Sequence, residues 1–142
     1  MKVKDVMTTN VITVPETMPL KEFAALIKKH RINGAPVVDE SGALVGIVTM
    51  TDMLKILRDI YYWYEVEKLK PGIGVKDALE KEKSSATVGS KMSTALRTVK
   101  EDDPIEVVLQ LMCKHNIHTI PVVKDGKLVG IVGATDIVHI CV

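Results

Sequence analysis

The chain has 142 residues, and its 19 Lys and Arg against 18 Asp and Glu give a formal net charge of +1. This balance gives no support to a nucleic-acid or membrane surface that acts through bulk charge. No apolar run is long enough to span a bilayer, and Met1–Asn10 has no apolar signal-peptide core. The hydrophobic share of 46% is sufficient for a filled interior, so we expect one compact cytoplasmic module.

Apolar runs and turn residues in the first half of the chain alternate between strand and helix patterns. They predict a strand at Val11–Val14, a helix from Leu20 to about His30, a strand at Pro36–Asp39 and a strand at Leu44–Thr49. Pro19 suits the first turn of that helix, and the two later strands are apolar enough for burial on both faces. Thr51 and Asp52 are typical N-caps for a helix that begins at Met53.

The second half of the chain repeats this order. It predicts a strand at Leu96–Val99, a helix at Pro104–Lys114, strands at Pro121–Val123 and Leu128–Val132, and a last helix from Thr135 and Asp136. Pairing Val3–Glu40 with Val88–Asp125, and Gly42–Arg58 with Gly126–Val142, gives 23 identities in 55 aligned positions. A fixed period indicates one structural unit built twice. The sequence therefore predicts two β-α-β-β-α repeats, residues 1–58 and 88–142, in one module.

Residues 59–87 have no counterpart in the repeat and are predicted to be a helical insertion or linker. The pattern extends the preceding helix over Asp59–Lys70, breaks it at Pro71–Gly74, and adds a short charged helix at Val75–Lys83 before a loop at Ser84–Thr87. Four of the five aromatic residues lie here, at Tyr61, Tyr62, Trp63 and Tyr64. We favour packing within the module or its dimer for them; a partner surface and an adenine-stacking platform are the alternatives.

Titratable and nucleophilic residues form no arrangement typical of an enzyme. No paired carboxylates, Ser-His-Asp set or Cys-His pair recurs, and Cys113 and Cys141 have no neighbours at zinc-ligand spacing. We expect Cys113 to be a buried free thiol on a helix. His30 and His115 fall at helix ends, where a cation is favourable. We therefore predict a protein that is not an enzyme and holds no metal.

Two segments, Gly46–Asp52 and Gly130–Asp136, each join a buried strand to a helix. A helix N-terminus presents free N–H groups and partial positive charge, which suit a phosphate. Thr hydroxyls can donate to phosphate oxygens, and an Asp carboxylate can accept hydrogen bonds from two ribose hydroxyls. Each segment could therefore hold a nucleotide. The alternative is that the Thr and Asp residues of both segments only cap their helices, and for either segment taken alone capping is favoured.

The duplicated pattern resembles a tandem pair of CBS (cystathionine β-synthase) domains, also called a Bateman module. The resemblance rests on Met7–Thr9, Val11–Val14, His30–Val38, Gly46–Asp52 and their second copies, and it covers the whole chain except residues 59–87. It implies an α/β fold in which two pseudo-symmetric repeats enclose two clefts. Each cleft is implied to be a site for an adenosine-containing ligand such as AMP, ADP, ATP or S-adenosylmethionine, with no required cofactor.

By resemblance, each cleft combines the Thr/Asp motif of one repeat with segments of the other. One cleft would use Ile47, Thr49, Thr51 and Asp52 with Arg97, Ile117 and His118. The other would use Ile131, Thr135 and Asp136 with Asn10, Ile12, Ile32 and Asn33. The Asp side chains would hold the ribose, the Thr residues the phosphate, and the Ile side chains the adenine.

The second copy has Gly133 where the family has Ser or Thr. Because Arg97 and His118 add phosphate partners, we expect the first cleft to bind the more anionic ligand; Gly133 could equally relieve crowding, and Arg97 could be a solvated surface residue. The resemblance also implies a stand-alone regulatory module, a sensor of ligand or energy state for an unknown regulated protein. It would form a homodimer through the helices beginning at Met53 and Ile137. The alternative is a structural or protein-interaction dimer with degenerate clefts and no nucleotide dependence.

Overall fold

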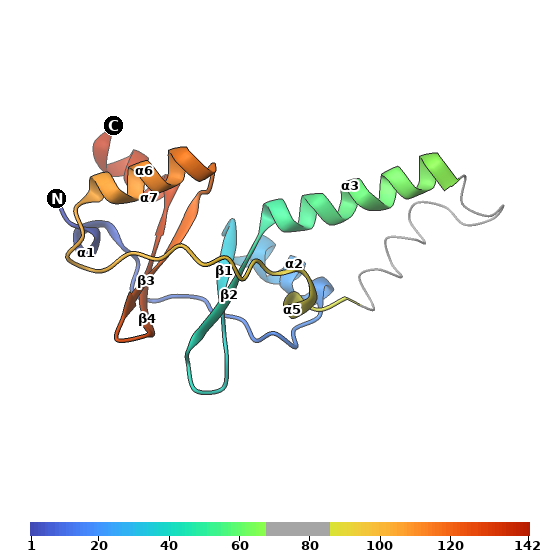
Figure 1. The fold of residues 1–142 in the computed structure, drawn as a ribbon, viewed down its shortest axis with the longest axis horizontal. Helices are drawn as coiled ribbons and strands as arrows, with labels where there is room; N and C mark the ends of the chain where they lie inside the picture. Colours follow the sequence, from blue (N-terminus) through green and yellow to red (C-terminus); the bar gives the residue numbers. More distant parts are fainter. Residues whose placement is uncertain (68–85) are drawn as a thin grey trace.

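The structure is a computed structural model that describes residues 1–67 and 86–142, with side chains described for residues 1–59 and 86–142. Its elements in chain order are α1 (Val3–Val6), α2 (Leu20–His30), β1 (Gly34–Val38), β2 (Leu44–Thr49), α3 (Met50–Glu67), α5 (Val88–Lys91), α6 (Ile105–His115), β3 (Thr119–Lys124), β4 (Lys127–Gly133) and α7 (Ala134–Cys141). The α/β fold of two repeats is confirmed (Figure 1). The expected helix at Val75–Lys83 and the aromatic side chains at 61–64 lie outside the described residues.

Each repeat is built around one antiparallel hairpin, and the two hairpins have the same register. Pro36 pairs with Ile47 in the first, and Pro121 pairs with Ile131 in the second. In both ladders the register shifts at the same place, between Val37 and Val38 in the first and between Val122 and Val123 in the second. The hairpins lie side by side in Figure 1, and Ala43 forms a bridge to Lys127 between them. The duplication in the sequence is therefore a duplication of backbone geometry.

The strands predicted at Val11–Val14 and Leu96–Val99 do not form, which corrects the sequence analysis. Only their last residues pair: Val14 bridges in parallel to Val37, and Val99 to Val122. The reason is that the residues just before these segments pair with the hairpin of the other repeat: Thr8 pairs with Ile131, and Ser93 pairs with Ile47. Residues 9–13 and 94–98 therefore cross between repeats and have no neighbour along which to build a ladder.

Both helices that follow the hairpins begin earlier than expected, at Met50 and Ala134 rather than after Asp52 and Asp136. The Asp residues sit inside the first turn, and their carboxylates accept hydrogen bonds from the residue before the helix. Asp52 Oδ2 accepts from the N–H of Thr49 at 2.8 Å, and Asp136 Oδ2 accepts from the N–H of Gly133 at 2.9 Å. An acidic residue at this position satisfies a donor outside the helix and favours the positive helix end.

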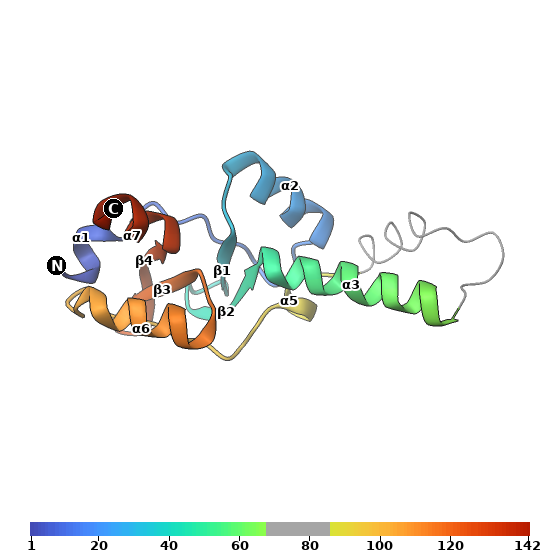
Figure 2. The same cartoon turned by 90° about the horizontal axis from the view of Figure 1, so that it is seen from above.

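The N-terminal segment of each repeat packs in the hydrophobic core of the other repeat. Val3 and Val6 of α1 pack in the core of the second repeat, while Ala86 and Val88 pack in the core of the first. Backbone hydrogen bonds fix both crossings: the Val3 N–H donates to the Asp103 carbonyl at 2.9 Å, and its counterpart at Val88 donates to residue 18 at 2.8 Å. Figures 1 and 2 both show α1, from the start of the chain, beside α7, from its end, at the left-hand end of the molecule.

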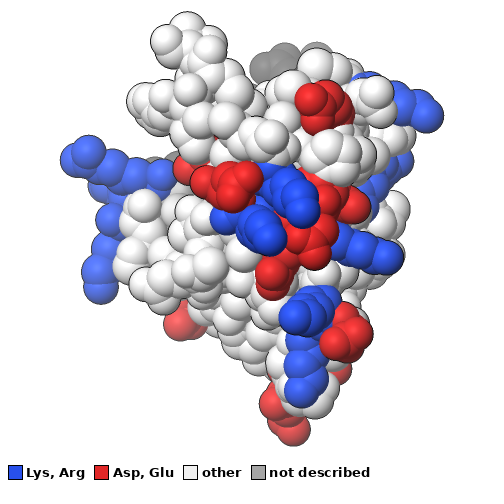
Figure 3. Space-filling view, turned by 90° about the vertical axis from the view of Figure 1, so that its left-hand side faces the viewer, with Lys and Arg blue, Asp and Glu red and all other residues white. Residues whose placement is uncertain are grey.

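The surface differs from the sequence analysis at Cys113, which is exposed rather than buried. The buried face of α6 is formed by Ile105, Val108 and Met112, and Cys113 follows Leu109 by one turn on the exposed side. At the α1 end, Figure 3 shows basic and acidic side chains interspersed, and Asp102 there pairs with Lys4 at 3.1 Å. Among the helices in the described ranges, none combines the length and the apolar character that crossing a membrane requires.

Candidate functional site

Two cavities lie against the helix starts that the sequence singled out. The larger, of about 500 Å³, contains the start of α3 and is called here the Asp52 cleft. It is lined by every residue expected for the first cleft, namely Ile47, Thr49, Thr51, Asp52, Arg97, Ile117 and His118. The smaller, of about 260 Å³, contains the start of α7 and is called the Asp136 cleft. It is lined by every residue expected for the second, namely Asn10, Ile12, Ile32, Asn33, Ile131, Thr135 and Asp136.

Asp52 divides its carboxylate between the fold and the cavity. Oδ2 accepts from the N–H of Thr49 at 2.8 Å and from its hydroxyl at 3.1 Å, and the Asp52 N–H lies 3.3 Å from the same hydroxyl oxygen. Within the described residues Oδ1 has no hydrogen-bond partner. One oxygen therefore stabilises the start of α3, and the other remains an unused acceptor on a residue that lines the cleft.

This arrangement gives Thr49 and Thr51 different roles. The Thr49 hydroxyl is directed at Asp52 and caps α3, so it is not free to donate to a ligand. The first N–H of the helix, at Met50, is also used, donating to the Asn33 carbonyl at 2.8 Å. The N–H and hydroxyl of Thr51 have no partner in the described part of the chain. Thr51 is thus the donor that the helix start offers to an anion.

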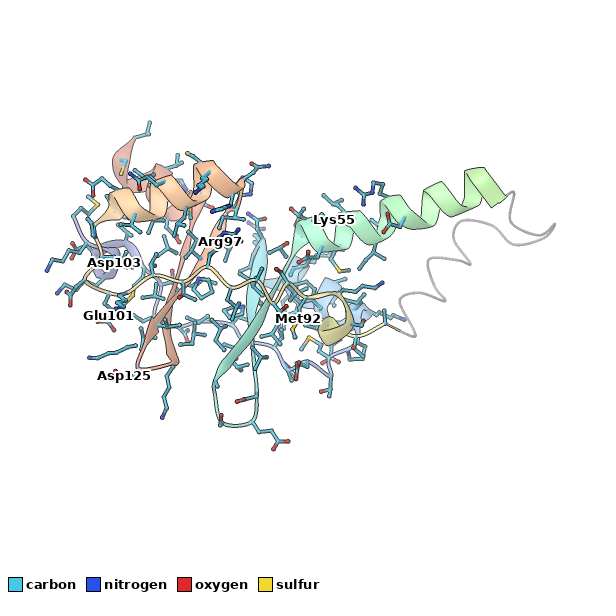
Figure 4. The ribbon with its side chains drawn as sticks, viewed as in Figure 1. Lys55, Met92, Arg97, Glu101, Asp103 and Asp125 are labelled. Carbon is cyan, nitrogen blue, oxygen red and sulfur yellow. The ribbon has the colours of Figure 1, made fainter. Side chains whose placement is uncertain are left out.

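Basic and titratable side chains gather on the Asp52 cleft. Lys55 and His115 line it together with Arg97 and His118. Partial burial, and then the charges of Arg97 and Lys114, lower the pKa of His115. In Figure 4, Lys55 comes from α3 and Arg97 from the segment between α5 and α6. The sequence analysis missed Lys55, although its spacing from Asp52 places both on one helix face.

At the start of α7, Gly133 replaces the capping Thr, so the Asp136 carboxylate accepts one hydrogen bond fewer than that of Asp52. Asp136 Oδ2 accepts a single hydrogen bond, from the Gly133 N–H. A Cβ added at Gly133 would lie 3.2 Å from Asp136 Oδ2, and the backbone there has an ordinary φ of −98°. The position therefore tolerates a side chain with a small shift. The sequence analysis also missed Arg31, which lines this cleft. Arg31 directly follows α2 and has a left-handed backbone conformation.

The two clefts share part of their walls. Asn33, His118 and Thr119 line both cavities. Each of the first two is also tied by its carbonyl to a helix start: Asn33 accepts from the N–H of Met50, and His118 accepts from the N–H of Ala134, both at 2.8 Å. The turns that follow α2 and α6 therefore connect the clefts to each other.

Metal chemistry has no support in the described part of the chain, where no group of three or more His, Cys, Asp and Glu residues could hold an ion. Besides their basic side chains, both clefts have a carboxylate oxygen, a Thr hydroxyl and backbone N–H groups at a helix start. Such a set recognises hydroxyl groups and anionic oxygens.

Comparisons with known proteins identify the duplicated unit. The CBS domain family matches residues 3–59 and 87–142. The chain is 32% identical over 135 residues to the CBS domain-containing protein YhcV of Bacillus subtilis, a match that covers 95% of this chain and 81% of that protein. It is 33% identical over 136 residues to the L-aspartate semialdehyde sulfurtransferase of Methanocaldococcus jannaschii, but there the match covers 95% of this chain and only 22% of the enzyme.

Solved structures of similar chains carry adenosine compounds. The CBS domain pair of protein MJ0100, in complex with 5′-methylthioadenosine and S-adenosyl-L-methionine, has a TM-score of 0.77 and 32% identity, covering 99% of this chain and 95% of that one. CBSX2 in complex with AMP has a TM-score of 0.75 and 25% identity, covering 99% and 95%. These ligands are adenosine compounds with and without a phosphate.

Proposed function

The chain belongs to the CBS domain family, and on that premise we propose that it is a regulatory module that binds an adenosine-containing ligand in the clefts between its repeats. The observation that carries the proposal is the arrangement of Asp52 and Asp136. Each lies at a helix start, holds that start with one carboxylate oxygen, and lines a cavity, while its other oxygen has no hydrogen-bond partner among the described residues. The ligands of the MJ0100 pair and of CBSX2 support the same class of compound.

In the proposed complex the ribose hydroxyls donate to the second carboxylate oxygen of Asp52. The adenine lies against Ile47 and Ile117, which line the same cavity from different repeats. A phosphate at the start of α3 accepts from the N–H and hydroxyl of Thr51. The Asp136 cleft binds in the corresponding way through Asp136 and Thr135.

The Asp52 cleft adjoins a candidate dimer surface. Met50 and Leu54 line this cleft and are also 41% and 57% exposed, on the helix that the sequence analysis assigned to a homodimer. On α7, Val138 and Ile140 are 56% and 48% exposed. We propose that these apolar side chains pack against a second copy, and that the ligand favours one packing arrangement over another. The resulting change would be read by a partner protein, with no catalysis by this chain.

Calorimetric titration of the purified chain with AMP, ATP and S-adenosylmethionine tests the proposal. We expect at least one of them to bind, and Asp52→Ala to weaken that binding. Sedimentation with and without the bound compound then tests the homodimer. No heat from any of the three compounds, with an unchanged dimer in Asp52→Ala, would favour the alternative of an interaction protein whose clefts are degenerate.

A further inference from the structure

The basic side chains around the clefts are distributed unequally. Lys55, Arg97, His115 and His118 all line the Asp52 cleft, whose carboxylate is that of Asp52. The Asp136 cleft has Arg31 and the shared His118 against Asp136. The repeat itself supplies the comparison: the counterparts of Lys55 and Arg97 are His139 and Ile12. His139 does not line the Asp136 cleft, and Ile12 lines it without a charge.

Among the described residues, Asp52 is the one carboxylate that lines the Asp52 cleft, and it lies there with Lys55 and Arg97. Neither Lys55 nor Arg97 forms an ion pair with any residue in 1–59 or 86–142. The charge of Arg97 also disfavours protonation of His115 and so contributes to the lowered pKa of that side chain. Two cationic side chains against one carboxylate leave the cleft with an excess of positive charge, which favours an anionic ligand.

Lys55 lies one helical turn after the proposed phosphate position at the start of α3. It follows Thr51 by four residues and Asp52 by three, so all three share one face of the helix. A long side chain on a helix leans toward the preceding turn, which here contains Thr51 and its unpaired donors. Arg97 lines the same cavity from outside this helix (Figure 4). A first phosphate at Thr51 therefore leaves Lys55 and Arg97 for the phosphates that follow it.

We propose that the Asp52 cleft takes an adenosine ligand with two or three phosphates, and that Lys55 is the residue that sets this preference. The Asp136 cleft, at about 260 Å³ against about 500 Å³, takes an adenosine ligand with no more than one phosphate. This inference rests on the proposed function and specifies the ligand class of each cleft.

The test measures the affinities of adenosine, AMP, ADP and ATP by calorimetry in a chain whose second cleft is disabled by Asp136→Asn. Affinity rises along the series in this background. Adding Lys55→Met lowers the affinity for ATP roughly tenfold, the loss of a charge-assisted contact, and leaves adenosine unchanged. The matched control is Lys124→Met, which removes one positive charge from an exposed residue outside both clefts.

The outcomes separate this inference from the proposed function. If adenosine binds but ATP binds no more tightly than AMP, the proposed preference for two or three phosphates is wrong, while the proposed adenosine site is retained. The same conclusion follows if Lys55→Met and Lys124→Met lower the affinity for ATP equally, since the effect is then one of net charge. If no member of the series binds, the proposed function fails and this inference fails with it.

Discussion

In the proposed complex Asp52 has a structural and a recognition role in one side chain, and the two can be separated by the choice of substitution. Asp52→Ala removes the acceptor of the Thr49 N–H and hydroxyl, so it should lower the free energy of unfolding by about 1 kcal/mol. Asp52→Asn keeps an oxygen for this contact and places its NH₂ group on the cleft side. It should cost less stability while still weakening ribose binding.

Chemical denaturation of both variants measures this difference. If Asp52→Asn and Asp52→Ala lose the same stability, the amide oxygen does not replace the carboxylate in the helix-start contact, which contradicts the expected difference. The corresponding change in the second copy, Asp136→Ala, provides the matched comparison, because Asp136 accepts only the Gly133 N–H.

His115 predicts how ligand affinity depends on pH. In the ligand-free protein, partial burial, Arg97 and Lys114 lower its pKa, so it is neutral near pH 7. A phosphate in the Asp52 cleft favours the protonated form and raises this pKa, so binding takes up a proton. The affinity for AMP should therefore increase as pH falls from 8 toward the ordinary histidine range near ~6.5.

Calorimetry of wild type and His115→Gln at each pH isolates this effect, because the titration of the AMP phosphate is common to both proteins. The difference between them should shrink as pH rises. Equal pH profiles for the two proteins would contradict the assignment of His115 to the anion site.

At the scale of elements, the sequence predicted the parts whose signals are local. The hairpins and the helices α2 and α6 follow from β-branched runs, turn residues and helical spacing, and they form within a residue or two of the expected bounds. The Val11–Val14 strand was not predictable, because a strand needs a partner along its length, and no local pattern shows that Thr8 is paired in the other repeat. The start of α3 depends likewise on a Thr49–Asp52 contact that competes with capping by Thr51.

The close approach of each hairpin to a crossing segment predicts a sensitive glycine. A Cβ at Gly46 would lie 2.5 Å from Met92 Sδ and 3.1 Å from the Ser93 carbonyl oxygen. The Met side chain can move, but the Ser93 backbone pairs with Ile47 and cannot move independently. Gly46→Ala should therefore lower the free energy of unfolding by about 1–3 kcal/mol.

Thermal denaturation measures this cost, and Gly133→Ala is the control, since its Cβ would meet the carboxylate of Asp136 at 3.2 Å and no backbone atom closer than 3.9 Å. Equal stability of Gly46→Ala and wild type would show that the hairpin and the crossing segment are not held against each other.

At the scale of the whole molecule, the exchange of leading segments makes the two repeats dependent on each other. Val3 is fully buried in the second core and Val88 in the first. Val3→Ala removes two methyl groups from the second core and should lower the free energy of unfolding by about 2 kcal/mol. The loss should fall on the second repeat, although Val3 belongs to the first in the chain.

Hydrogen exchange locates this effect. Amide protection should fall in β3 and β4 in Val3→Ala, and in β1 and β2 in the matched variant Val88→Ala. Loss of protection confined to the repeat that contains the mutation would contradict the exchanged cores.

The arrangement of the two repeats also explains which cleft residues could be predicted from the sequence. The repeat, with the family resemblance, placed fourteen residues on two clefts, and each lines its cavity. Lys55, His115 and Arg31 were missed because their contribution depends on which side of a helix or turn faces the other repeat. That orientation follows from the crossing segments and not from the local motif.

The most direct test of the central claim is the number of AMP molecules bound per chain at saturation in wild type, Asp52→Asn and Asp136→Asn. If the two Asp residues hold ligand in separate clefts, wild type binds two molecules per chain and each variant binds one. A stoichiometry that both substitutions leave unchanged would contradict the account, because the ligand would then be bound outside these clefts.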